Sequence, residues 1–249
     1  GCRYDGEWRR GLPHGKGVMK YANGDQFRGR FEAGSRRTGK GEYVWANGIE
    51  RHVGGEFALG ERWGIGVTTS KDGSFHSGQY RAGRAQGEGQ EEAKGIGMLY
   101  EGEYANGLRH GQGCASTSEV TGLLTLLQWM EYEGEWVLDT KDGFGTLRRK
   151  SGAVLSGHFK MDRALGGGEL LCPDGSSYQG EFMNGVADGR GVYRGVNRGD
   201  VYQGEFMAAH RHGRGRLSFA NGDKLDGEFC WNKLCGRATF QSCWGAIRE

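Results

Sequence analysis

The sequence predicts an all-β fold, an elongated single-layer antiparallel array of β-hairpins that forms a solenoid-like ribbon. Three observations lead to this prediction. A glycine-anchored pattern recurs about every 23 residues along the whole chain, aromatic residues alternate with the anchoring glycine, and tight-turn dipeptides separate the segments. A fixed period over a whole chain is typical of a repeat array, in which each unit packs only on its neighbours.

The repeat is clearest in residues 100–113, which read YEGEYANGLRHGQG, with Gly102 as the reference glycine. An aromatic residue follows every reference glycine two positions later. We therefore predict one array of ten repeats over residues 1–249, with an insertion at 114–131 where one interval lengthens to 32 residues. The reference glycines are Gly6, Gly29, Gly55, Gly78, Gly102, Gly134, Gly157, Gly180, Gly204 and Gly227.

The composition fits a thin array better than a thick globular core. The chain has 50 glycines and two prolines, and its hydrophobic content is 36%. The glycines do not recur at every third position, which excludes collagen. A net charge of +2 does not indicate a nucleic-acid-binding protein. No apolar run approaches the ~20 residues that span a bilayer.

Each repeat should contain two short strands. Tyr100, Gly102 and Tyr104 alternate, so they share one face of the first strand, and the glycine makes room for the rings. The letters NGLRHG then predict a turn, and a second strand starts near Gly113. It ends in dipeptides such as Asn23-Gly24, which predict two-residue hairpin turns with both residues at positive φ. About twenty strands at ~4.8 Å spacing would extend roughly 95 Å.

The pattern Y-x-G-x-(W/F/Y)-x-x-G-x-x-H-G-x-G resembles the MORN (membrane occupation and recognition nexus) repeat. Residues 4–17, 100–113, 178–191 and 202–215 match it best. The resemblance implies a single-layer sheet used as a scaffold, often in cytoskeletal or ciliary structures and sometimes attached to a catalytic domain. Lipid binding is also proposed for the family. The leading aromatic is replaced in four repeats, by Val53, His76, Leu155 and Leu225.

Two groups of residues are candidates for contacting partner proteins. The insertion carries an apolar cluster that a one-layer sheet cannot bury completely, so it either folds over the sheet as a longer hairpin or docks to a partner. The aromatic face of the central repeats is the second group. The candidates are Leu123, Leu124, Leu126, Leu127, Trp129 and Met130 in the insertion, and Tyr100, Tyr104 and Trp136 on the aromatic face.

Basic residues gather in the turns, among them Arg36, Arg37, Arg148 and Arg149. They could meet anionic lipid or an acidic protein surface, although dispersed, solvated charge explains them equally well. Seven repeats carry a glutamate directly after the reference glycine. We interpret this ladder as a solvated face with cross-strand partners rather than as acid–base machinery.

The six cysteines do not form a disulfide framework, and we expect reduced thiols in a cytosolic compartment. Cys230, Cys235 and Cys243 cluster near two histidines, but their spacing is not that of a zinc site, so we expect no metal. Residues 34–41 nearly match a phosphate-binding loop, yet the final hydroxyl is missing and a hairpin is predicted there. We therefore expect no cofactor.

These observations predict a non-enzymatic structural scaffold within a multi-subunit assembly. The resemblance places it in the cytoplasm, at the cytoskeleton or in a ciliary or flagellar axoneme. One alternative is a peripheral membrane tether, for which membrane contact would be primary rather than secondary. Another is the regulatory arm of an enzyme whose catalytic domain lies outside these residues. No nucleic-acid partner is expected.

The two ends of the array are expected to need covering. The repeats begin at Tyr4 and run to the C-terminal residues, and open edge strands invite pairing with another chain. Other proteins or a second copy of the chain are the expected partners there. Because the chain starts at Gly1 and shows no signal peptide, either its true start is missing or it is an excised piece.

Overall fold

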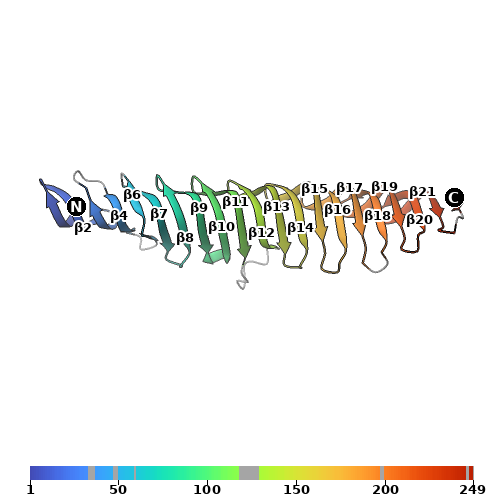
Figure 1. The fold of residues 1–249 in the computed structure, drawn as a ribbon, viewed down its shortest axis with the longest axis horizontal. Coiled ribbons are helices and arrows are strands. Elements are labelled where there is room, and N and C mark those ends of the chain that lie inside the picture. Colours follow the sequence, from blue (N-terminus) through green and yellow to red (C-terminus); the bar gives the residue numbers. More distant parts are fainter. Residues whose placement is uncertain are drawn as a thin grey trace. The chain divides into compact units, whose positions relative to one another are not determined.

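The computed structural model describes residues 1–32, 37–46, 50–58, 60–117, 129–196, 199–244 and 247–248. The chain divides into two units, Gly1–Leu126 with Trp136–Asp139, and Leu127–Glu135 with Thr140–Glu249. Within each unit the strands pair antiparallel and follow one another in chain order (Figure 1). The exception is β5 and β6, which do not pair with each other and both lie between β4 and β7. The predicted all-β architecture of antiparallel hairpins is confirmed.

The described residues contain 22 strands and one short 3₁₀ helix. No helix in this part of the chain is long and apolar enough to cross a bilayer. The elements up to the insertion are β1 (Arg3–Arg9), β2 (Leu12–Lys20), β3 (Gln26–Phe31), β4 (Arg37–Val44), β5 (Glu50–Val53), β6 (Glu56–Ala58), β7 (Glu61–Ser70), β8 (Phe75–Arg81), β9 (Arg84–Ala93), η1 (Lys94–Ile96), β10 (Met98–Ala105) and β11 (Leu108–Thr117). Those after it are β12 (Trp129–Val137), β13 (Thr140–Arg149), β14 (Val154–Lys160), β15 (Arg163–Leu171), β16 (Ser177–Met183), β17 (Val186–Arg194), β18 (Val201–Met207), β19 (His210–Ser218), β20 (Lys224–Cys230), β21 (Lys233–Gln241) and β22 (Ile247–Arg248).

The core of each unit is a staircase of aromatic rings on one face of the sheet, which we call the aromatic face. The ring of Tyr100 meets Tyr104 of its own strand at 5.3 Å and Trp136 of the next repeat at 5.4 Å, both edge to face. In the second unit Tyr178 contacts Phe182 and Phe206 in the same way. Edge-to-face pairs are the preferred aromatic geometry, so each repeat is tied to its neighbour.

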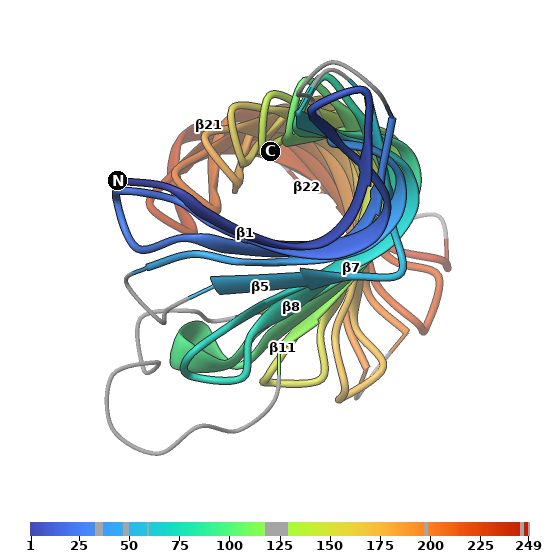
Figure 2. The same ribbon diagram turned by 90° about the vertical axis from the view of Figure 1, so that its left-hand side faces the viewer.

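The glycines make this staircase possible. Gly102 and Gly113 face each other across β10 and β11. A Cβ atom built on Gly113 would lie 2.6 Å from both Cε2 and Cζ of Tyr100, so the ring lies flat over the bare backbone. Equivalent glycines repeat from strand to strand, and we call each such row a glycine column. Figure 2 shows that strands such as β1 curve along their length.

A bulge in the pairing of β10 with β11 explains why the repeat contains the sequence pattern H-G-x-G. Gly102 pairs with Gly113, but Tyr104 pairs with Arg109, so the residues His110 to Gln112 lie opposite Glu103 alone. Gly111 within this bulge has φ +64°, a left-handed conformation that favours glycine. The Glu103 Oε1 atom accepts a hydrogen bond from the Gln112 backbone N–H at 2.9 Å.

The turns at the two ends of the hairpins differ in type, and the predicted two-residue type does not form at Asn23-Gly24. Around Asn23-Gly24 only the glycine has positive φ, and Gly24 N–H donates to the Tyr21 carbonyl oxygen at 2.9 Å. This is a three-residue loop, not the predicted two-residue turn. Two consecutive positive φ angles occur instead at the other end of the hairpins, in the pairs Arg10-Gly11, Ala82-Gly83, Asn106-Gly107, Leu138-Asp139, Met161-Asp162, Asn184-Gly185, Ala208-Ala209 and Trp231-Asn232.

The alanine pair in one of these turns allows a stability prediction. Ala208 and Ala209 have φ +48° and +64°, which alanine adopts poorly. Replacing them with Asn and Gly should raise the free energy of unfolding by about 1 kcal/mol, because this pair matches the two positive φ angles. Urea denaturation followed by circular dichroism measures the change. The reverse exchange of Asn184-Gly185 to Ala-Ala should lower stability, and equal effects of both exchanges would refute the explanation.

Candidate interaction surfaces

The side chains that recur most regularly in the repeats form hydrogen bonds within their own hairpins. The Tyr100 hydroxyl donates to the Glu103 carbonyl oxygen at 3.0 Å, and the same bond recurs in the repeats of Tyr4, Tyr132, Tyr178 and Tyr202. Burial raises the pKa of Tyr178 to about 12, so its hydroxyl remains a donor at neutral pH. These tyrosines are therefore structural.

The glutamate ladder is also structural, in a way that the sequence did not reveal. The carboxylate of Glu103 holds the backbone N–H of the bulge, and Glu7, Glu135, Glu181 and Glu205 make the same contact in their own repeats. The partner of these five glutamates is thus the opposing backbone, whereas Glu228 has the predicted cross-strand partner, Arg214, at 3.9 Å. This position also places the carboxylate beside the left-handed glycine of the bulge.

Basic side chains near the turns stack on the staircase. The Arg109 guanidinium lies 4.8 Å from the Trp136 ring centroid, and its Nε is 2.9 Å from Asp139 Oδ1. In the second unit Lys141 lies 4.3 Å from the Trp129 ring and pairs with Asp162 at 3.3 Å. These cations join one repeat to the turn of the next, and the two members of each ion pair are too far apart in sequence for local patterns to connect them.

The third repeat is built differently from the prediction. His52, not Val53, takes the position of the leading aromatic, because His52 pairs with Tyr43 and lies over Gly55 and Gly66. The additional Gly54, with φ +79°, shifts the register by one residue. Val53 consequently points to the opposite face, where it is exposed.

The predicted partner contacts on the aromatic face are not accessible. Tyr100, Tyr104 and Trp136 are 2, 4 and 2% exposed. We therefore revise this prediction, because a partner could touch these rings only if the staircase were disrupted. In the insertion, Trp129 is half-buried beneath Lys141, and Met130 is exposed. The remaining insertion candidates lie outside the described residues, namely Leu123, Leu124, Leu126 and Leu127.

The four predicted lipid-contacting arginines are divided between the two units. Arg148 Nε pairs with Glu131 at 3.1 Å, and Arg149 is half-buried. Arg37 begins β4, whereas Arg36 lies outside the described residues. Contact of these arginines with a membrane therefore stays a prediction.

The C-terminal cysteines do not form a metal site. Cys230 and Cys235 are joined by a disulfide across the last full hairpin, which corrects the expectation that all thiols are reduced. Two sulfurs bonded to each other cannot serve as thiolate ligands. The disulfide does not include Cys2, Cys114, Cys172 or Cys243. Within the described ranges, no three His, Cys, Asp or Glu side chains are grouped to hold a metal ion.

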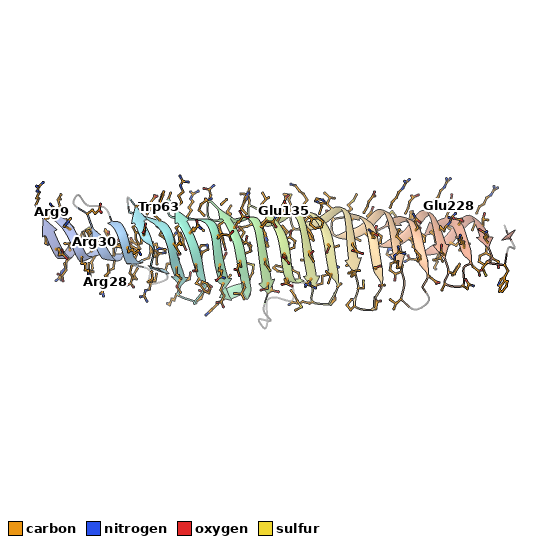
Figure 3. All side chains as sticks on the ribbon, in the orientation of Figure 1. Arg9, Arg28, Arg30, Trp63, Glu135 and Glu228 are labelled. Atoms are coloured by element: carbon orange, nitrogen blue, oxygen red, sulfur yellow. A yellow bond between two sulfur atoms is a disulfide. The ribbon has the colours of Figure 1, made fainter. Side chains whose placement is uncertain are left out.

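The face opposite the staircase carries an exposed apolar cluster that the sequence pattern did not indicate. Trp63, Ile65 and Val67 alternate on β7 and are 41, 73 and 36% exposed. Val53 of β5 lies directly opposite Val67 in the ladder. We call these four residues the β7 patch. Figure 3 labels Trp63, the first of them.

Comparison with known proteins agrees with the repeat pattern. The MORN repeat family matches residues 4–26, 33–50, 55–75, 76–92, 100–116, 132–154, 178–199 and 202–224. These eight segments leave unmatched the two hairpins whose leading residue is Leu155 or Leu225, which accounts for the difference from the predicted ten. MORN repeats are non-catalytic interaction modules.

Curated relatives share the same repeats. Alsin from Rattus norvegicus and alsin from Homo sapiens are each 29% identical over 230 residues, covering 91% of this chain. Alsin from Mus musculus is 29% identical over 183 residues, covering 72%. The chain spans 12% of the length of the rat and human proteins and 9% of the mouse protein.

Solved structures give only distant similarity. The TCP10 domain of Danio rerio CPAP shares 12% identity with a TM-score of 0.36, covering 93% of this chain and 97% of that domain. The Drosophila melanogaster SAS-4 (dCPAP) TCP domain, solved with a proline-rich motif of Ana2, shares 10% identity with a TM-score of 0.31, covering 74% and 82%. Likeness at this level supports no conclusion. The repeat matches, which cover more than half of the sequence, and the hairpin built on their glycines and tyrosines show that this chain belongs to the MORN repeat family.

Proposed function

We propose that this chain is a non-enzymatic scaffold that binds other proteins of a multi-subunit assembly. The β7 patch is the observation that carries the proposal. Its residues alternate on one strand and are exposed, although the residues paired with Ile65 and Val67 on the neighbouring β8 are the polar Gln79 and Ser77. Contiguous exposed apolar side chains of this kind mark protein contact surfaces.

The residues that recur in each repeat make contacts within the chain, and this supports the same function. Tyrosines, glycines and the glutamate ladder are all engaged within the hairpin, so the residues that vary between repeats form the exposed surface. A cytoskeletal setting, including a ciliary or flagellar axoneme, is the finer proposal. It rests on the family's frequent role in such structures.

Capture from cell extract followed by mass spectrometry tests the scaffold proposal. Ile65→Arg places a charge in the β7 patch without touching the staircase, and it should remove a defined set of cytoskeletal proteins from the captured fraction. Phe144→Arg is the matched control, because Phe144 occupies the equivalent exposed position of β13 in the second unit. A captured set that is unchanged by Ile65→Arg, or that contains no cytoskeletal protein, would refute the corresponding part of the proposal.

The insertion is tested in the same experiment. Replacing residues 119–130 with a short turn should remove a different subset of partners if this segment docks. Identical captured sets with and without the segment would show that it serves only the fold. The replaced segment includes Trp129 and Met130, so the same experiment tests whether these two residues contact a partner.

A second candidate is an interaction arm of a longer protein. The matched segment is a small part of each alsin, so in those proteins the repeats accompany much additional sequence. The full reading frame decides this point. A frame that encodes the array alone would exclude it.

A further inference from the structure

A groove crosses β1 to β4 on the face opposite the staircase. Its floor is the glycine column of Gly6, Gly17, Gly29 and Gly41, whose members pair from strand to strand. The groove has a volume of about 780 Å³. The side chains along it are Asp5, Lys16, Val18, Arg28, Arg30 and Lys40.

The lining is strongly basic. Lys16, Arg28, Arg30 and Lys40 are all exposed, and none of them forms an ion pair within the described part of the chain. Figure 3 labels Arg28 and Arg30, which flank Gly29 on β3. Asp5 is the one carboxylate in the lining. The groove is therefore a concentration of uncompensated positive charge.

Nearby carboxylates do not neutralise these cations, because they have other partners. Glu42 pairs with Arg51 Nε at 2.6 Å. The Glu7 carboxylate accepts a hydrogen bond from the Lys16 backbone N–H at 3.1 Å and is thereby engaged with the backbone. The positive charge consequently faces solvent and can attract an anionic partner.

The second unit contains the same groove with a different lining. Its floor holds Gly180, Gly191 and Gly204, and its volume is about 510 Å³. Position by position, Gln203 stands where the first groove has Arg28, and Glu205 stands where it has Arg30. The fold thus supplies the groove in both units, but the second groove has two cations, Arg190 and Arg214, against one carboxylate, whereas the first has four against one.

We propose that the groove over β1–β4 binds an extended acidic segment of a partner protein. Four strands span about 14 Å, the length of roughly four extended residues. The glycine floor has no side chains, so a backbone can approach closely beside the row of cations formed by Lys16, Arg30 and Lys40. The opposite charges give the specificity of the contact.

The same unit disfavours a flat anionic membrane as the occupant. On the same face, Glu101 and Glu103 flank Gly102 of β10, and Glu88 lies opposite Glu103 on β9. A bilayer is far wider than the groove, so it would meet these carboxylates as well and be repelled by them. A polypeptide segment can occupy the basic groove alone. The inference rests on the proposed scaffold function and identifies the chemistry of one partner.

Reciprocal exchanges between the two grooves test the proposal. Fluorescence anisotropy would measure the binding of a labelled oligoglutamate peptide to the full chain, with oligoglutamine as the control peptide. The double change Arg28→Gln and Arg30→Gln should weaken binding about tenfold at about 50 mM salt. Gln203→Arg should strengthen it about threefold by giving the second groove a third cation. All these residues are exposed, so circular dichroism should show an unchanged fold.

Location is tested independently by crosslinking. A photoreactive residue at Val18, in the first groove, should crosslink to the oligoglutamate peptide more than the same residue at Val192, its counterpart in the second groove. Equal crosslinking at the two positions, or binding that is insensitive to the Arg28/Arg30 change, would overturn the proposal. Binding of phosphatidylserine vesicles without binding of the peptide would overturn it in favour of a membrane.

The proposal can fail separately from the scaffold function. If oligoglutamate does not bind but Ile65→Arg still removes partners, only the groove assignment fails. If Ile65→Arg has no effect while the groove binds the peptide, the β7 patch assignment fails instead. If oligoglutamate does not bind and Ile65→Arg also has no effect, no evidence remains for protein binding by this face of the sheet.

Discussion

Gly113→Ala is expected to destabilise the first unit by about 3 kcal/mol. The added methyl would overlap the Tyr100 ring, which cannot move aside because Tyr104 and Trp136 pack against it. Any displacement would also break the hydrogen bond from the Tyr100 hydroxyl to the Glu103 carbonyl oxygen. Chemical denaturation with hydrogen exchange resolved along the chain would locate the loss in the strands around β10 and β11.

The control for this substitution is another strand glycine without such a neighbour. A Cβ atom at Gly167 in β15 would meet nothing within 4 Å, and its backbone is not left-handed. Gly167→Ala should therefore change stability by less than about 0.5 kcal/mol. If both alanines cost the same, the cost would come from general strand propensity and not from the ring.

A double-mutant cycle separates the ring from other causes. In a Tyr100→Leu background, Gly113→Ala should cost far less than it does alone, because the overlapping atoms are gone. The chain already contains this combination in its last full repeat. Leu225 stands at the tyrosine position there, and Ala238 stands opposite Gly227 where other repeats have glycine. Equal costs in the two backgrounds would contradict the coupling.

This coupling explains why the sequence predicted the fold so well. The alternation of Tyr100, Gly102 and Tyr104 has one physical solution, in which the rings share a face and glycine makes room for them. Because the pattern recurs in most repeats, a single local argument extends over the array. The same local argument placed the turns correctly.

The errors arose where a local pattern has more than one structural outcome. Asn23-Gly24 suits both a two-residue turn and the three-residue loop that forms, since both need positive φ at the glycine. The one-residue shift at Gly54 moved His52 to the aromatic face and Val53 away from it. Sequence spacing near Gly54 does not reveal which of two adjacent residues will face the core.

Properties of the candidate surfaces depend on cross-strand neighbours, which the sequence did not identify. The link between Arg109 and Asp139 joins residues in different repeats. Likewise, the basic groove arises because Lys16 of β2 and Arg30 of β3 lie side by side across the sheet, although fourteen positions separate them. The order of charged residues along the chain does not indicate this cluster, because its members become neighbours only through strand pairing.

A second large effect is expected from acidification. Lowering the pH from about 7 to about 5 should cost the first unit about 3 kcal/mol, because two histidines, one buried and one half-buried, must remain neutral in the fold. Burial, followed by the positive charge of Arg62, lowers the pKa of His52 and of His76 from 6.5 to about 4. His52 is also affected by the charge of His76, and it is fully buried.

The hydrogen bonds around His52 also favour the neutral ring. Thr68 Oγ1 accepts hydrogen bonds from Arg62 Nη1 at 3.0 Å and from the Tyr80 hydroxyl at 2.8 Å. A threonine hydroxyl has one proton to donate, and His52 Nδ1 lies 2.9 Å from it. The Nδ1 atom therefore acts as the acceptor, which requires it to be unprotonated. Protonation would replace this acceptor with a second donor and leave a charge beside Arg62.

The direction and range of the effect follow from these pKa values. Well above pH 6.5 the histidines are neutral in both the folded and the unfolded chain, so they give no pH dependence there. Between pH 6.5 and about 4 the unfolded chain takes up protons that the folded unit excludes, and stability falls by up to about 1.4 kcal/mol per pH unit for each histidine. Hydrogen exchange at about pH 7 and about pH 5, corrected for intrinsic exchange rates, would measure this loss in β5 to β9.

The decisive comparison uses Phe at both positions. His52→Phe copies the second repeat, where Phe27 lies over Gly29 and Gly41 in the same way as His52 lies over Gly55 and Gly66. The variant with His52→Phe and His76→Phe should lose the pH dependence between about 5 and 6.5, even if its stability at neutral pH differs from that of the parent. Hairpins led by tyrosine, such as β16–β17, provide an internal reference that should not weaken over this range. A variant that retains the parent's slope would show that other groups bind the protons, because Phe cannot titrate and the staircase geometry is otherwise conserved.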